Sequence, residues 1–429
     1  MRDIAFMLVF IPLWLSCFVR PYLGPLVWAW VSMMYPHRLA YGFVHNFPAA
    51  YVVAVTTLLV FVVTREKYPF PRNGPAVLLV VFFGWACVSS LASFNDPDMV
   101  FDLWLKVAKI QLMLFVTMMM LSGRRQIIWL VAVIALSVGF YGFKGGIFTL
   151  LTQGRGNVLG PPGSFIEPNN ELGVALVTVF PLLYFLYGIS RNKWLRWGLL
   201  ATALLTLAAI FGTYSRAAVL AVAAMAVFMG FKSNHKVLTV TVLAVALAGT
   251  VALLPERWME RMQSISTHQD ESSQSRFKVW TLIGRIAMDH PLTGGGYRIT
   301  ENPKTWEKYG SDDSTVAYAP HSIYFQVLAE HGFVGLFLFL VIGVATWRLA
   351  SRVARQARDG PDADWAPQLM GMIQVSLIGY GVAGGFNALA NYDVPYYLAA
   401  IVAMVARDLK VGRAPMIEAK AGAAVNLSR

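Results

Sequence analysis

Long apolar runs separated by short polar loops recur throughout the 429 residues of the sequence. A run of about twenty apolar residues can cross the bilayer as a helix, which satisfies its own backbone hydrogen bonds where no water is present. With 57% hydrophobic and 14% charged residues, the chain is too apolar for a soluble protein. The sequence therefore predicts an all-α, polytopic membrane protein.

The apolar runs define the expected spans. They begin with the stretch 4–34 and continue at 48–63, 75–92, 103–121, 126–142, 171–189, 197–212, 216–231, 237–254, 321–347, 367–387 and 392–406. If residues 4–34 cross once, broken at Arg20 and Pro21, the chain has about twelve transmembrane helices with both ends in the cytoplasm. The alternative is two short crossings of the same stretch, with an external N terminus.

The charges in the loops indicate the orientation. Lys and Arg gather in loops such as 65–72, 191–196 and 348–358, whereas the loops 95–98 and 154–171 are acidic or rich in Gly and Pro. The positive-inside rule places the basic set in the cytoplasm. Because topology accounts for the net charge of +12, we do not expect nucleic-acid binding.

This orientation places a large loop, 255–320, together with Arg216 and His321, on the outer side of the membrane. We expect residues 1–413 to form one transmembrane domain, with this loop over the site, and residues 414–429 to form a disordered cytoplasmic tail. No nucleotide sugar is available outside the cytoplasm. A transferase on that side needs a lipid-linked donor that is already activated.

The loop is expected to contain a helix over 275–289, with Ser273 or Ser275 as its N-cap. We expect this helix to lie on the membrane over the site. Its apolar face would consist of Phe277, Trp280, Ile283 and Ala287.

His321 opens an apolar run and is the candidate catalytic residue. At helical spacing it shares one face with Tyr324, Phe325, Leu328, Gly332 and Gly335. An imidazole with a pKa near ~6.5 can take the proton from an attacking hydroxyl as a general base. The simpler alternative is a histidine that only caps its helix.

Two arginines are candidates for binding a diphosphate. Arg216 opens a short span, where an unpaired cation is costly, and Arg276 would present a planar guanidinium from the loop helix. The alternatives are an arginine that reaches the lipid headgroups and a solvated helix face. Weaker candidates for substrate binding are Arg285, Arg298, Arg155 and Tyr324, and Lys144 could add to the positive field.

The stretch GPPGSFIEPNNELGVAL offers Asn169, Asn170 and Glu171 just before a span, for binding sugar or acceptor or for capping the helix. No metal site is expected. The acidic and histidine groups at 268–271 and 312–313 lack the spacing of a zinc or calcium site.

Residues 321–336, HSIYFQVLAEHGFVGL, resemble the signature of the O-antigen ligase and polymerase superfamily of bacterial membrane glycosyltransferases. The stretch SRAA at Arg216 and the position of Arg276 before His321 are similar to the superfamily's other motifs. The N-terminal run RDIAFMLVFIPLWLSCFVRPYLGPLVWAWVSMMYPHRLAYGF resembles O-glycosylation ligases associated with exosortase systems.

The resemblance implies transfer of a glycan from an undecaprenyl-diphosphate carrier to a hydroxyl at the periplasmic face of the bacterial inner membrane. It implies inversion without a metal or cofactor, with His321 as the base and Arg216 and Arg276 on the diphosphate. The expected acceptor is the lipid A core, then a protein hydroxyl, then a growing glycan.

A transporter or lipid flippase is the rival from another class, and a non-catalytic scaffold is the remaining one. A transporter would carry ionisable residues near the bilayer midplane. In this sequence only Lys106, Lys109 and Glu330 intrude into apolar runs, so the enzyme is favoured.

Overall fold

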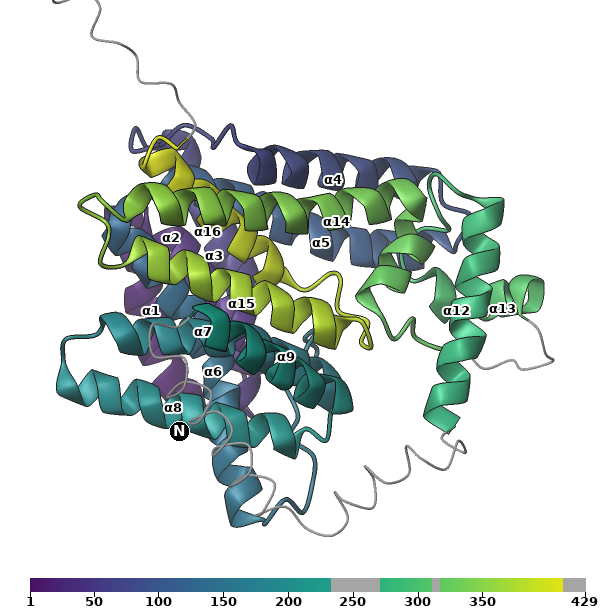
Figure 1. Cartoon of the computed structure of the whole chain (residues 1–429), viewed down its shortest axis with the longest axis horizontal. Coiled ribbons are helices and arrows are strands. Elements are labelled where there is room, and N and C mark those ends of the chain that lie inside the picture. Colours follow the sequence, from purple (N-terminus) through teal and green to yellow (C-terminus); the bar gives the residue numbers. More distant parts are fainter. Residues whose placement is uncertain (233–270, 311–316, 412–429) are drawn as a thin grey trace, which may run out of the picture.

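The computed structural model describes residues 1–232, 271–310 and 317–411 of the chain (Figure 1). Every regular element in those ranges is a helix, which confirms the all-α class. The elements are α1 (Arg2–Val19), α2 (Leu23–Met34), η1 (Pro36–Leu39), α3 (Ala49–Val63), α4 (Gly74–Leu91), α5 (Pro97–Met120), α6 (Gly123–Leu151), α7 (Asn169–Ile189), α8 (Lys193–Gly212), α9 (Arg216–Lys232), α12 (Glu271–Asp289), η3 (Ile299–Glu301), α13 (Pro303–Tyr309), α14 (Ile323–Ala357), α15 (Ala366–Gly384) and α16 (Asp393–Asp408).

Six of the described helices are long and apolar enough to cross a membrane, which confirms a polytopic helical membrane protein. They are α1, α4, α6, α7, α8 and α14. Of these, α7 is the most enclosed, with 78% of its apolar window buried, and α1 is the least, with 17%. The predicted total of twelve goes beyond this finding. The predicted span 237–254 and the tail 414–429 lie outside the described residues.

The first two helices form an antiparallel pair. The chain breaks at Arg20 as predicted, but Asp3 Oδ1 accepts hydrogen bonds of 3.1 Å from the backbone N–H groups of Gly42 and Val44. The start of α1 therefore lies beside the segment that follows α2. The predicted single net crossing of 4–34 is wrong, and the alternative with two antiparallel segments fits the structure.

Short polar side chains fix where several helices begin. The carboxylate of Asp96 accepts from the first N–H groups of α5, and the Asn192 side chain does the same for α8. Pro97 follows Asp96 at the first position of α5, where its missing N–H costs nothing. These caps explain why the apolar runs start as helices at these points.

The helix α14 is broken at Gly332, which has φ 68° and ψ −170°. The loop before η3 satisfies the backbone at this break, because Gly295 N–H donates to Ala329 O at 2.8 Å and Phe333 N–H donates to Pro291 O at 2.8 Å. The continuous helix face expected from residue 321 to residue 335 is therefore wrong. The break instead ties the segment around residues 291–295 to α14.

Replacement of Gly332 by alanine should destabilise the fold strongly. A Cβ there would overlap the carbonyl oxygen of Leu292, and the backbone conformation itself costs a residue other than glycine ~1–3 kcal/mol. Thermal unfolding in detergent measures the effect. Gly343→Ala is the matched control, because its Cβ meets nothing within 4 Å in the same helix. Equal melting temperatures of the two variants would contradict the account of the break.

The helix α12 crosses the end of the bundle at which α14 begins, at a steep angle to α4 and α14 (Figure 1). It begins at Glu271, earlier than predicted, so neither Ser273 nor Ser275 is its N-cap. On the predicted apolar face, Ile283 is buried but Phe277 is 67% exposed. A small separate core joins this helix to α13 and to the first turns of α14. It contains Val279, Leu282, Ile283, Ile286, Ala287, Ile299, Trp306, Tyr309, Leu328 and Ala329.

Candidate functional site

His321 lies in the loop immediately before α14, with Ser322 as the N-cap residue of that helix. Its backbone has a left-handed φ of 51°, which is uncommon for a residue with a side chain. Trp280 of α12 fixes the surrounding chain from both sides. Its indole N–H donates to Pro320 O at 2.9 Å, and its ring stacks on Phe325 at 4.8 Å between centroids.

Arg276 lies about one turn before Trp280 on α12, and its charge acts on His321. Burial of the imidazole, followed by this neighbouring charge, lowers the pKa of His321 below its ordinary value of 6.5. Both side chains are half-buried. A lowered pKa favours the neutral imidazole, the form that a general base requires.

Arg276 also interacts electrostatically with Glu171, in the first turn of α7. Glu171 is half-buried, as are Asn169 and Asn170 before it. The same guanidinium thus connects the start of α7 with His321. The structure brings this polar motif and the two outer-loop candidates into one neighbourhood.

Arg216 is the first residue of α9, and the start of α7 packs directly against the turn before it. The Asn169 side chain donates to Thr213 O at 2.7 Å. A Cβ at Gly173 would lie 3.1 Å from that of Ser215, so the two helix ends are in close contact. The half-buried Arg216 therefore follows a turn that is packed against the start of α7.

The candidate site consists of Arg276 with His321 and Glu171, on which its charge acts, and of the start of α7, which contacts the turn before Arg216. Guanidinium groups can hold a phosphate by paired, charge-assisted hydrogen bonds. The imidazole supplies a proton acceptor beside them. The arrangement suits a reaction in which a hydroxyl displaces an anionic leaving group.

Residues 201–340 match the family model described as O-antigen ligase, and this region contains Arg216, Arg276 and His321. This part of the chain is similar to the O-antigen ligase family. Residues 1–191 match a family of unknown function, DUF5935. A search of curated proteins found no match. The predicted superfamily is confirmed, whereas the resemblance of the N terminus to exosortase-associated ligases stays a prediction.

Arg285 and Arg298, which were predicted as weaker candidates, make contacts within the segment that carries α12, η3 and α13. Arg285 donates to the carbonyl oxygens of Tyr309 and Gly310 at 2.8 and 3.0 Å, which secures the end of α13. Arg298 forms an ion pair of 2.7 Å with Glu301. Neither side chain is directed by these contacts to His321.

Tyr324 faces away from the charged groups. Its hydroxyl donates to Gly381 O at 2.9 Å, and it lines an apolar cavity of about 370 Å³ between α14, α15 and α16. Other residues that line this cavity are Ile323, Phe339, Gly343, Trp347, Leu377 and Tyr396. The cavity thus begins next to the loop that carries His321.

Arg155 is exposed on the loop before α7. The hydroxyl of Tyr214 donates to Gly154 O, so this loop lies beside the turn before Arg216. Lys144 lies elsewhere, because it lines a separate cavity with Arg2. Of the two, only Arg155 is on a segment next to the site.

Glu330 supports the outer loop rather than the charged site. Its carboxylate accepts from the Arg298 backbone N–H at 3.3 Å and from Gln326 and Asn391 at 3.4 Å each. The sequence indicated packing for this residue, but the role of Trp280 in holding His321 was missed. Among the described residues, no group of three His, Cys, Asp or Glu side chains is placed to hold a metal ion.

Proposed function

We propose that the protein is an O-antigen ligase that transfers a glycan from undecaprenyl diphosphate to the lipid A core. The reaction would take place at the periplasmic face of the bacterial inner membrane. The observation that carries the proposal is the half-buried imidazole of His321, on which the charge of Arg276 acts, within the region that matches the O-antigen ligase model.

The proposed reaction is a single displacement. The acceptor oxygen attacks the anomeric carbon while His321 takes its proton, and the bond between that carbon and the diphosphate oxygen breaks. The electron pair leaves on the diphosphate, whose charge Arg276 and Arg216 stabilise. The anomeric configuration inverts, and no step requires a metal or a cofactor.

The apolar cavity beside Tyr324 supports a lipid-linked donor. Its walls come from α14, α15 and α16, and it begins within three residues of His321. A polyprenyl chain has no polar group to satisfy and therefore suits such a cavity. The diphosphate at the head of the lipid would then reach the two arginines.

A protein hydroxyl or a growing glycan would be attacked by the same chemistry, so an acceptor assay tests the proposal. Purified protein is given the lipid-linked glycan together with lipid A core, peptide or free glycan, and products are separated by gel. We expect product on the lipid A core. Product only on peptide or on glycan would instead assign a protein ligase or a polymerase.

The pH dependence of transfer should report His321. Because burial and Arg276 lower its pKa, we expect activity to persist below ~6.5, the ordinary imidazole pKa, and to fall when the pH drops through the lowered pKa and the base is protonated. Arg276→Gln should move this acidic limb to higher pH. Profiles of kcat, each scaled to its own maximum, measure the shift, and a limb that stays in place would contradict the assignment.

A further inference from the structure

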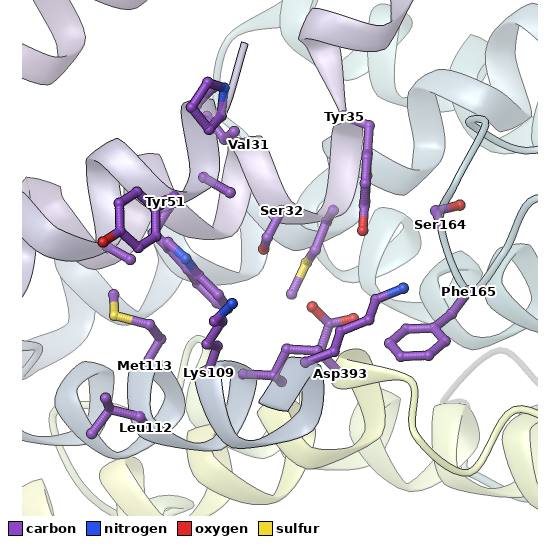
Figure 2. Close-up of a pocket in the computed structure, with 18 of the residues that line it drawn as sticks. Val31, Ser32, Tyr35, Tyr51, Lys109, Leu112, Met113, Ser164, Phe165 and Asp393 are labelled. Carbon is purple, nitrogen blue, oxygen red and sulfur yellow. The ribbon is translucent and has the colours of Figure 1, made fainter. Parts of the chain in front are cut away.

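A second cavity, of about 590 Å³, lies apart from the site around His321 (Figure 2). Its walls come from α2, α3, α5, the start of α16 and the loop before α7. Most of the wall is apolar, as contributed by Val31, Met33, Ala54, Val55, Leu58 and Met113. No residue of the charged site lines it.

Two lysines of α5, Lys106 and Lys109, line this cavity one helical turn apart. Lys109 is twelve residues from Pro97 at one end of the helix, or ~18 Å, and eleven from Met120 at the other. It is therefore near the middle of a helix in a membrane-spanning bundle. A cation at that depth is costly unless it meets an anion or water.

Lys106 has partners within the protein. Its ammonium lies 3.8 Å from the centroid of the Phe165 ring, and its charge interacts with the buried carboxylate of Asp393. The cation on this lysine is thus compensated from the loop before α7 and from the start of α16.

Lys109 differs, because it is exposed and forms no ion pair with any described residue. Its side chain reaches into the cavity (Figure 2). Asp102, also on the lining, is not within ion-pair distance of either lysine. Burial lowers the pKa of His37, another lining residue, to about 4, so that it adds no charge. The cavity therefore presents one uncompensated cation.

The cavity opens between α3 and α5. Tyr51 and Val55 on α3 and Leu112 on α5 all line it and are 63%, 38% and 46% exposed. Both helices lie in predicted spans, 48–63 and 103–121, where exposed apolar side chains are expected to face lipid. A molecule that enters by this opening comes from the bilayer.

We propose that this cavity binds a lipid with a phosphate headgroup, with the phosphate on Lys109 and the chain against α3 and α5. The phosphate can belong to an anionic phospholipid or to a polyprenyl phosphate, which share this chemistry. The inference goes beyond the proposed transfer reaction and does not depend on it. It adds a lipid site that residues 164–166, in the loop before α7, help to line.

Lipid binding to the delipidated full chain in detergent, measured by native mass spectrometry, tests this. The probes are phosphatidylglycerol, undecaprenyl phosphate and, as the uncharged lipid, dioleoylglycerol. Lys109→Gln should bind both phosphate lipids about tenfold more weakly, since a charge-assisted contact is lost. Lys109→Arg should retain binding, as should Lys193→Gln, the matched control at the exposed start of α8.

Every variant also carries Arg276→Ala, which removes lipid binding at the proposed donor site from the measurement. The result therefore does not depend on whether the proposed function is correct. Stronger retention of one phosphate lipid than of the other identifies the source of the phosphate. Binding unaffected by Lys109→Gln, or dioleoylglycerol bound as tightly as phosphatidylglycerol, would overturn the proposal.

Discussion

Replacement of His321 by alanine should abolish glycan transfer while the folded yield stays unchanged. A general base contributes about 10²–10⁴-fold to a rate, and the proposed mechanism gives this chain no other group for the role. The residue precedes α14 and is only half-buried, so the substitution leaves no large cavity. The transfer rate at saturating donor, with the melting temperature measured in parallel, checks both parts.

His45→Ala is the matched control, since His45 lies on the loop after η1 and contacts the carbonyl oxygen of Ala40 at 2.9 Å. This variant should transfer glycan at the wild-type rate. If His321→Ala were as active as the control, the histidine would only cap its helix, and the assigned mechanism would be wrong.

Replacement of Arg276 by alanine should reduce kcat/KM by about 10²–10³-fold, the effect of removing one donor that stabilises charge in the transition state. The guanidinium is placed to act on both His321 and Glu171. Arg276→Lys should restore part of the rate, because it keeps the charge but loses paired hydrogen bonding. Initial rates over a range of donor concentrations separate kcat from KM.

Arg352→Gln is the control for charge alone. Arg352 is exposed near the opposite end of α14, beyond the break at Gly332, and its removal should leave the rate unchanged. Equal losses in Arg276→Ala and Arg352→Gln would show that transfer depends on overall charge rather than on a diphosphate contact.

The apolar runs were sufficient to predict the helices, because a bilayer admits few alternatives for such segments. They did not show that the first two helices, α1 and α2, run antiparallel to each other. The direction of α1 depends on a contact between Asp3 and Gly42, and hydropathy carries no information on such pairs. The break at Gly332 was hidden for a similar reason, because the segment that satisfies it lies around Pro291, far away in the sequence.

For the candidate site, too, the sequence predicted some features, and others depended on how the helices pack. Residue type and motif selected Arg276 and His321, which the structure places together although 45 residues separate them. They ranked Arg276 above Arg285 and Arg298 by its position before His321, but they did not predict the contacts that the other two arginines make. Their different roles follow from the carbonyl and carboxylate groups that each meets, and these depend on how α12, α13 and η3 pack.

The most direct test of the central claim is transfer by the purified full chain in proteoliposomes. The assay supplies undecaprenyl-diphosphate-linked glycan and lipid A core, with EDTA and without nucleotide, and follows the glycan by gel. The account predicts glycan on the lipid A core with the wild type and none with His321→Ala. Donor that is bound and recovered intact, with no product on lipid A core, peptide or free glycan, would contradict the account and favour a flippase.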